Sequence, residues 1–349
     1  MVLKLTGLAD LSPLGFDTVI DVRSPAEYAE DHLPGAINLP VLDDEERARV
    51  GTIYKQQSPF LARKIGAALV ARNAARHLEG ALADKGGGWR PLVYCWRGGQ
   101  RSGSFATILS QVGWRVELLE GGYKGWRRLV VDALTVAPPP PRLFVLDGNT
   151  GTAKTELLSR MAALGHQVID LEGLANHRGS LFGHRPGGQP GQKAFDGRLA
   201  VLLAALDPAR PVLVEAESSR VGALMLPKQL WAAMGVAPRL NIAAPLMARA
   251  RYLGQAYADL TVDPARLAAI IDSLRPLHPA DRIEGWQAAA AAGDFVELAA
   301  GLMRDHYDAR YEKHRARYGT DRDVTLHSAD LDEPALQDLT RRLARAIGE

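Results

Sequence analysis

The sequence contains one cysteine in 349 residues, so it cannot form an internal disulfide or build a zinc site from several cysteines. Such scarcity of thiols is typical of the reducing cytoplasm, where we expect this protein. No run of about eighteen apolar residues is present, so no membrane span is predicted. The first residues also lack a basic region followed by a long apolar stretch, and no secretory signal is expected.

Excess charge of either sign is also missing, since the formal net charge is only +2. A dedicated non-specific nucleic-acid binder is usually more basic, although a local basic patch can still contact RNA phosphates. Apolar residues make up 47% of the chain and charged residues 23%, which is ordinary for a globular protein. A chain of this length favours two domains over one core, and a monomer is the expected state.

Four consecutive prolines at 138–141 mark the boundary between those domains. Such a run cannot continue a helix and favours a stiff, extended segment. We therefore expect a domain at 1–134, a linker at 135–141 and a second domain at 142–349. Strands alternate with helices in both domains, which predicts α/β folds with parallel sheets.

The first domain is expected to carry a helical insertion over about 43–80, and the second a helical extension beyond about residue 220. Ser24 and Pro25 suit the N-cap and first position of a helix, and Gly113 suits the end of another. The expected strands and helices, in chain order, are a strand at 17–23, a strand at 90–95, a helix at 102–113, a strand, turn and helix at 114–134, a strand, glycine loop and helix at 142–165, and strands at 166–173 and 211–218.

The single cysteine lies in VYCWRGGQRSGS, residues 93–104, where a strand is expected to meet a helix. Backbone N–H groups of a tight loop and the helix N-terminus stabilise a thiolate there. Glycines let the loop curl, arginines add positive charge, and Ser102 can cap the helix. The candidate catalytic residues are Cys95, Arg97, Gly98, Gly99 and Arg101.

Two other interpretations of this loop remain open from the residues alone. A lone cysteine is often simply a buried small residue. In addition, five residues separate Cys95 from Arg101, which is the spacing used by cysteine phosphatases. Those phosphatases place a histidine before the cysteine, whereas this chain has Tyr94.

A second glycine loop, LDGNTGTAKTELL, matches the phosphate-binding pattern G-x-x-x-x-G-K-[ST] at all positions except Ala153. In that pattern backbone donors wrap a diphosphate, the lysine neutralises it and the hydroxyl reaches Mg²⁺. An alanine is held there only if its backbone angles are accessible without glycine. The candidate phosphate-binding residues are Gly148, Thr150, Gly151, Lys154 and Thr155.

Acidic and polar residues further along are expected to complete this site. Glu215 and Glu217 end a strand and suit the role of a Walker B carboxylate, with Asp170 and Glu172 as alternatives. All four could equally be solvated carboxylates at strand ends. The glycine-rich segment 177–192 suits a mobile loop that closes over an anion, or a simple surface loop. Its candidate ligand-binding residues are His177, Arg178 and Ser180. No protein metal site is predicted beyond a Mg²⁺ ion carried with the phosphates.

Three motifs of the first domain, DVRSPAEYAEDHLPGAINLP, VYCWRGGQRS and LEGGYKGW, together resemble a rhodanese domain over roughly residues 15–130. The resemblance implies that Cys95 carries a transferable sulfur or selenium atom as a persulfide-type intermediate. It makes residues 96–101 the cradle for that atom. Asp21 and Arg23 match the family's Asp-x-Arg pair, for which we expect a structural role.

Across the whole chain, the order of VGTIYKQQSPFLARKIGAALV, CWRGGQRS, GNTGTAKTELL, IDLEGLANHRGSLFG and VEAESSRVG resembles the tRNA 2-selenouridine synthase family. The resemblance implies a rhodanese-like domain fused to a P-loop NTPase-like domain. It implies that the sulfur of wobble 2-thiouridine in tRNA is first geranylated by geranyl diphosphate. Selenium from selenophosphate then replaces the geranylated sulfur.

Under this interpretation the partners are thiolated tRNA and an enzyme that supplies selenophosphate. The candidates for contacts with RNA are basic segments at 310–322 and 341–345, tyrosines 307, 311 and 318, and Arg63, Lys64, Arg72 and Arg76 of the helical insertion. Such mixed charges are also typical of a solvated helix face. Two other classes remain open. One is a plain sulfurtransferase with a regulatory nucleotide-binding domain, and the other is a non-catalytic rhodanese-like module that binds a partner.

Overall fold

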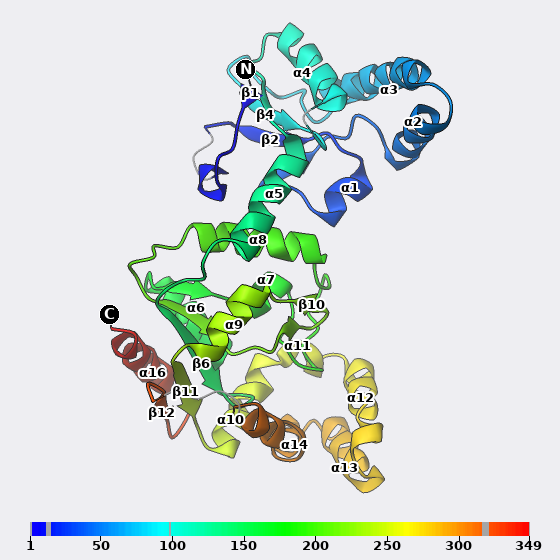
Figure 1. Ribbon diagram of the computed structural model, residues 1–349. Coiled ribbons are helices and arrows are strands. Elements are labelled where there is room, and N and C mark those ends of the chain that lie inside the picture. The colour runs from blue at the N-terminus through cyan, green and yellow to red at the C-terminus, as the bar shows by residue number, and fades with distance from the viewer. Residues whose placement is uncertain (1, 12–14, 98, 316–320, 349) are drawn as a thin grey trace. The chain divides into compact units, whose positions relative to one another are not determined.

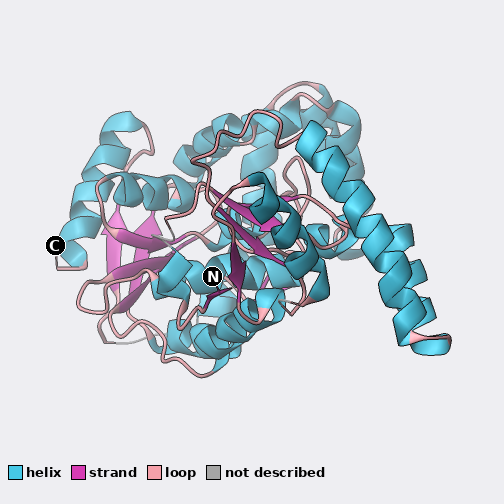
Figure 2. Cartoon of the chain, turned by 90° about the horizontal axis from the view of Figure 1, so that it is seen from above, coloured by secondary structure: helices cyan, strands magenta, loops and turns pink. Residues whose placement is uncertain are grey.

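The computed structural model describes residues 2–11, 15–97, 99–315 and 321–348, except for the side chains of Asp259 and His314. The chain forms two compact units. The first unit contains residues 1–137 and 190–205, and the second contains residues 138–189 and 206–349. In both units strands lie side by side in a sheet that helices flank (Figures 1 and 2).

The sheet of the first unit is parallel throughout, with the strand order β1-β5-β4-β2-β3. Its strands are β1 (Val2–Leu3), β2 (Thr18–Asp21), β3 (Ala36–Asn38), β4 (Pro91–Tyr94) and β5 (Glu117–Leu119). Its helices are the 3₁₀ turn η1 (Leu8–Leu11), α1 (Pro25–Glu30), α2 (Asp44–Gln56), α3 (Pro59–Glu79), α4 (Gln100–Val112), α5 (Gly122–Thr135) and α8 (Gln192–Ala204). The α/β fold predicted for this part is confirmed.

Local sequence signals set several of these boundaries. Ser24 is the N-cap of α1 and forms a capping box with Glu27, with Pro25 at the first helical position as predicted. Gly113 ends α4 in the left-handed conformation. The insertion predicted over 43–80 consists of α2 and α3, which pack on each other, and α3 also packs on α4.

Helix α8 follows the proline linker in sequence but belongs to the first compact unit, unlike the predicted domain division. The Arg127 guanidinium pairs with Asp196 at 2.6 Å and donates to the Lys193 carbonyl at 3.0 Å. A Cβ at Gly197 would lie 2.8 Å from the Trp126 ring, so the two helices α5 and α8 approach closely only with glycine there. This packing of α8 on α5 could not be predicted from the position of α8 in the sequence, which is after the proline linker.

The sheet of the second unit is also parallel, with the order β12-β11-β6-β8-β7. Its strands are β6 (Leu143–Gly148), β7 (Gln167–Ile169), β8 (Val212–Glu215), β11 (Arg239–Ala243) and β12 (Val324–His327), beside a hairpin of β9 (Arg220–Val221) and β10 (Leu224–Met225). Its helices include α6 (Lys154–Ala163), α7 (Leu171–Ala175), α9 (Lys228–Val236), α10 (Leu246–Ala256), α11 (Ala258–Thr261) and α12 (Pro264–Asp272). The remaining helical segments are the 3₁₀ turn η2 (Arg275–Leu277), α13 (Ala280–Ala291), α14 (Phe295–Leu302), the π-helical η3 (Met303–Tyr307), α15 (Asp308–Arg315) and α16 (Glu333–Ala346).

The nearly all-helical pattern expected beyond residue 220 misses β11 and β12, which complete the second sheet. Arg239 opens β11 and is buried because it pairs with Asp147 on β6 at 2.7 Å. Polar residues such as Arg239 and Asn241 in β11 interrupt the apolar pattern by which a strand is predicted from sequence. Within the described residues, no helix is long and apolar enough to cross a membrane.

Candidate active site

Cys95 directly follows β4, and α4 begins five residues later, as the sequence predicts. Its Sγ accepts a hydrogen bond from the Gly99 N–H at 3.4 Å. The Ser102 Oγ lies 3.2 Å from the same sulfur and 3.3 Å from the Gly99 carbonyl, so its single proton can reach either acceptor. The thiol is 4% exposed. A buried sulfur surrounded by donors is suited to carrying negative charge.

Two opposing influences act on the pKa of Cys95. Burial raises the pKa, because it disfavours the thiolate. Hydrogen bonds from the Ser102 side chain and from the backbone N–H groups of Ser102, Gly99 and Arg97 lower it. The net result is a pKa below the ordinary thiol value. The loop therefore favours the nucleophilic form of this cysteine.

The two arginines of the loop differ in their surroundings. The Arg101 guanidinium donates to both carboxylate oxygens of Glu27, at 2.7 and 3.3 Å, so its charge is already paired. Burial raises the pKa of Glu27, but Arg101 and the Ser24 N–H lower it overall. Arg97 is exposed. Gly98, also predicted for this cradle, lies outside the described residues.

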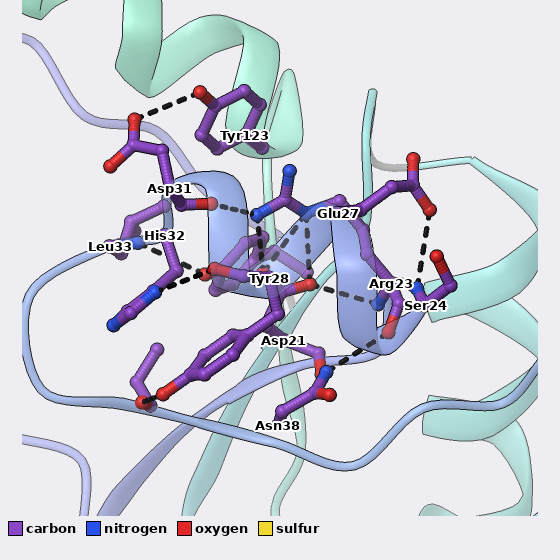
Figure 3. Close-up of polar contacts among 12 residues, drawn as sticks. Asp21, Arg23, Ser24, Glu27, Tyr28, Asp31, His32, Leu33, Asn38 and Tyr123 are labelled. Atoms are coloured by element: carbon purple, nitrogen blue, oxygen red, sulfur yellow. Dashed lines mark hydrogen bonds and ion pairs between the residues drawn. The ribbon is translucent and has the colours of Figure 1, made fainter. Parts of the chain in front are cut away.

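A buried polar network supports the loop from the neighbouring strand β2 (Figure 3). The Arg23 guanidinium donates to the Asp21 carboxylate at 2.7 Å and to the Asp31 carbonyl at 2.5 Å. It also lies 4.0 Å from the centre of the Tyr123 ring, and the Tyr123 hydroxyl donates to Asp31 at 2.9 Å. With both Asp21 and Arg23 fully buried, this pair is part of the scaffold.

The start of α5 is attached directly to the cysteine loop. The Tyr123 N–H donates to the Cys95 carbonyl at 2.9 Å, and the Lys124 N–H donates to the Trp96 carbonyl at 2.9 Å. The left-handed glycines 121 and 122 turn the chain into this position. The LEGGYKGW motif thus fixes the backbone of Cys95 and Trp96 through these two hydrogen bonds.

The phosphate-type loop connects β6 to α6 at the point where strand connections diverge, with β8 on one side of β6 and β11 on the other. Ligands of open α/β sheets bind at such a switch point. Gly148 has φ +149°, and a Cβ there would lie 2.8 Å from the Ile242 carbonyl. Gly151 has φ +83°, and its Cβ would lie 3.0 Å from the Arg249 carbonyl. Both glycines are required by the backbone.

Ala153 caps α6 with φ +59° and ψ +26°, in the left-handed region that glycine usually occupies. The side chain is 4% exposed and packs in the hydrophobic core of the second unit. Left-handed backbone costs a non-glycine residue about 1–2 kcal/mol. The alanine therefore keeps the conformation of the glycine it replaces, at the expense of local strain.

The side chains of the loop surround a cavity of about 680 Å³. Of the predicted residues, Thr150, Gly151, Lys154 and Thr155 line it, and so do Arg178 and Ser180. Lys154 Nζ donates to the Gly148 carbonyl at 2.8 Å and lies 5.6 Å from the centre of the Tyr311 ring. Lysine, arginine and backbone donors together make this a cavity for an anion.

The predicted Glu215 and Glu217 do not line this cavity, whereas the alternatives Asp170 and Glu172 do. Glu215 is 1% exposed and accepts the Glu172 N–H at 2.6 Å, so it fixes the backbone of that residue. Burial and the neighbouring carboxylates raise the pKa of all three glutamates, that of Glu217 to about 8. The strand-end acids are therefore not wall residues of the cavity.

His177 supports its own loop and does not line the cavity. Its Nδ1 accepts the Gly179 N–H at 3.1 Å, and its ring packs edge-on against His184. Burial and the nearby His184 and Arg185 lower its pKa, which favours the neutral ring. Arg178 instead stacks over the Tyr257 ring at 4.5 Å, on the cavity wall.

Several residues that complete the cavity were not predicted from the sequence. Tyr252, Tyr257 and Tyr311 come from α10, its C-terminus and α15, about a hundred residues or more from the loop. Arg249 donates to the Thr150 carbonyl at 3.1 Å and pairs with Asp308 at 2.8 Å. Tyr311 was expected on an RNA-binding surface, but it lies beside Lys154. Only the folded chain brings these residues to the phosphate loop.

Mg²⁺ prefers oxygen ligands and uses one or two carboxylates together with substrate phosphates. The Thr155 hydroxyl donates to the Glu172 carboxylate at 3.0 Å at the cavity wall, so these two side chains fit such an ion. No cluster of three or more metal-ligating side chains occurs within the described ranges. Any Mg²⁺ would therefore depend on the phosphate ligand for most of its coordination.

Comparison with known proteins places both halves of the chain. A rhodanese-like domain model matches residues 7–129, and a model described as the tRNA 2-selenouridine synthase AAA domain matches residues 141–269.

Proteins named tRNA 2-selenouridine synthase resemble the chain over most of its length. The one from Nitrosomonas europaea is 36% identical over 78% of this chain and 71% of its own length. The one from Aeromonas salmonicida is 38% identical, covering 71% and 67% respectively, and the one from Alcanivorax borkumensis is 33% identical, covering 84% and 88%. The chain belongs to the tRNA 2-selenouridine synthase family.

Proposed function

We propose that this protein converts 2-thiouridine at the wobble position of tRNA into 2-selenouridine. The observation that carries the proposal is the shared identity with proteins of that name over two thirds or more of both chains. The chemistry of its own residues agrees, because one unit carries a stabilised thiolate and the other an anion-binding loop. We assign one reaction step to each.

In the first step the thiocarbonyl sulfur of the base attacks C1 of geranyl diphosphate. A carbon–sulfur bond forms, the carbon–oxygen bond to the diphosphate breaks, and the base loses its N3 proton. Lys154 and the loop N–H groups stabilise the departing diphosphate, which needs no phosphoryl transfer. Mg²⁺ held by Thr155 and Glu172 would add positive charge to that leaving group when bound. Arg178 and Arg185 lie on the cavity wall, where they can approach the same anion.

In the second step selenium from selenophosphate replaces the alkylated sulfur. The C2–S bond breaks as the C2–Se bond forms, geranylthiol leaves, and water takes the phosphoryl group to give phosphate. Alkylation makes the sulfur a better leaving group than a thiocarbonyl sulfur. We assign Cys95 and its loop to this step, because the loop has N–H groups that can donate hydrogen bonds to an anionic compound such as selenophosphate. A selenophosphate-forming enzyme must supply that donor.

Purified protein, thiolated tRNA, geranyl diphosphate and selenophosphate test the proposal directly. Mass spectrometry of the nucleosides should show S-geranyl-2-thiouridine with geranyl diphosphate alone and 2-selenouridine with both co-substrates. Cells that lack the gene should lose 2-selenouridine. Unchanged 2-selenouridine in those cells would contradict the function, and ATP hydrolysis with no response to geranyl diphosphate would favour a nucleotide-regulated sulfurtransferase.

A further inference from the structure

A smaller cavity of about 80 Å³ adjoins the phosphate cavity within the second unit. The two cavities share four wall residues, Thr150, Ser180, Leu253 and Tyr257. The remaining walls of the small cavity are mostly apolar and contain no charged side chain: Phe182, Gly254, Leu260, Thr261, Leu267, Phe295, Leu298, Ala299, Leu302, Met303 and Tyr307. A phosphate site therefore continues into an apolar one.

Helices between β11 and β12 supply most of these walls. Helix α14 contributes Phe295, Leu298, Ala299 and Leu302, and it packs against α10 and α13 (Figure 1). Leu267 on α12 and Leu298 on α14 are each 5% exposed, so these two wall residues are buried within the second unit. The helical extension thus forms a lined apolar chamber next to the phosphate loop.

The chemistry of the walls indicates which ligand can occupy both cavities. Of the five polar residues of the small cavity, three lie on the boundary that it shares with the phosphate cavity. A nucleobase needs hydrogen-bond partners around its edge, and the far walls offer only Thr261 and Tyr307 for that purpose. A hydrocarbon chain needs none. A diphosphate ester with an apolar chain fits this arrangement better than a nucleotide.

We propose that the small cavity holds the hydrocarbon chain of a prenyl diphosphate whose diphosphate lies on the loop at 148–155, and that Phe295, Leu298 and Ala299 limit the length of that chain. This inference rests on the proposed function, which requires such a donor. The same chamber then keeps water from the allylic carbon at the boundary between the two cavities.

Binding measurements on the full-length protein test the chamber separately from catalysis. Each methylene buried strengthens binding by about fourfold, so affinity should rise from inorganic diphosphate to dimethylallyl diphosphate to geranyl diphosphate. We expect calorimetry to give geranyl diphosphate an affinity at least about a hundredfold above that of inorganic diphosphate, which is the gain from burying about three to four of the carbons of its chain. Equal affinities for the three, or equally tight ATP, would overturn the inference.

Two substitutions in α14 and one matched control sharpen the test. Ala299→Phe fills the chamber and should weaken geranyl diphosphate at least about tenfold, with inorganic diphosphate unchanged. Phe295→Ala enlarges it and should shift the preference toward farnesyl diphosphate. Ala288→Phe makes the same change as the first variant on an exposed position of α13 and should alter neither affinity. An unaltered chain-length preference in both α14 variants would overturn the inference.

The outcome also separates this inference from the proposed function. If the protein transfers geranyl to tRNA but its affinity for prenyl diphosphates does not depend on chain length, the proposed function stands and the proposed binding of the chain in the small cavity is wrong. If affinity depends on chain length but no geranyl is transferred to thiolated tRNA, the binding of the chain in the small cavity is supported and the proposed function is contradicted. Unchanged thermal unfolding of each variant shows that its fold is intact.

Discussion

The buried sulfur of Cys95 depends on a small number of donors for its charge. Burial alone disfavours a thiolate, and the donors of the loop reverse that effect. The Ser102 hydroxyl is the only side chain among these donors, and it is itself fully buried. Removing it leaves the backbone donors in place and changes a single contact. Ser102 is therefore a positioning residue whose effect is measurable on the thiol itself.

We expect Ser102→Ala to raise the pKa of Cys95, because the variant loses a donor to the charged form. The thiolate absorbance, recorded against pH, measures this shift without interference from other thiols, since the chain has one cysteine. A rise of about one unit is expected. Thr107→Ala removes an exposed hydroxyl from the same helix and serves as the control. An identical titration curve for wild type and Ser102→Ala would contradict this account of the thiolate.

The buried glutamates near the phosphate cavity predict a dependence of stability on pH. Burial and Glu172 raise the pKa of Glu217 to about 8, so the folded protein keeps a proton there that the unfolded chain releases. Because the folded state binds more protons between the unfolded value near 4.5 and about 8, this group's stabilising contribution falls as pH rises through that window. Glu217→Gln removes the titration and should flatten the curve. Thermal unfolding between about pH 5 and about pH 8 measures the effect. An equally steep curve in the variant would contradict it.

Some site residues were predictable from the sequence because their signals are local. The glycines, Lys154 and Thr155 lie within one short motif, and the cysteine loop is equally compact. The pairing of Arg101 with Glu27 was not predictable, because the two residues lie 74 positions apart and meet only through the fold. Tyr257 and Tyr311 reach the phosphate loop in the same way. Contacts between residues that are distant in the sequence determine which of the predicted residues line the cavity.

Among the secondary-structure elements, those with strong local patterns were predicted and those with mixed patterns were not. The apolar strand β4 was predicted within a few residues, and the start of the capped helix α1 was predicted at Pro25. The strand β6 was predicted at the beginning of the segment 142–165. In contrast, β11 is a five-residue strand that begins with a buried arginine, and β12 is a four-residue strand with three exposed positions. Strand β11 is stabilised by pairing with both β6 and β12, and the edge strand β12 by pairing with β11. Such pairing partners are not visible in a local pattern.

The turn from the phosphate loop into α6 allows a stability prediction at Ala153. Ala153→Gly relieves left-handed strain but loses a buried methyl group and adds freedom to the unfolded chain. These effects oppose each other, so we expect a change below about 1 kcal/mol in the free energy of unfolding. Ala153→Val should cost more than about 2 kcal/mol, because β-branched residues avoid positive φ and the site is buried. Urea denaturation measures both, and a neutral valine variant would contradict the left-handed backbone.

The whole chain combines two anion sites, each formed at the C-terminal end of a parallel sheet in its own compact unit. In the thiol loop the Arg101 guanidinium is paired with Glu27, and the phosphate loop contains no cysteine, since Cys95 is the only one in the sequence. Neither site could perform both proposed steps with its described residues. The two steps should therefore be separable by single substitutions.

We expect Cys95→Ser to abolish 2-selenouridine formation while S-geranyl-2-thiouridine accumulates, because the first step needs only the phosphate loop. Lys154→Ala should reduce geranylation by at least about a hundredfold, since it removes the lysine of the loop to which we assign the leaving diphosphate. Given tRNA geranylated in advance, the Lys154→Ala protein should still incorporate selenium, whereas Cys95→Ser should not. Nucleoside mass spectrometry measures all three outcomes, and Lys228→Ala, an exposed lysine of the same unit, is the control. Selenium incorporation by Cys95→Ser would contradict a role for the thiol, and equal loss of both steps in each variant would contradict the assignment of one step to each loop.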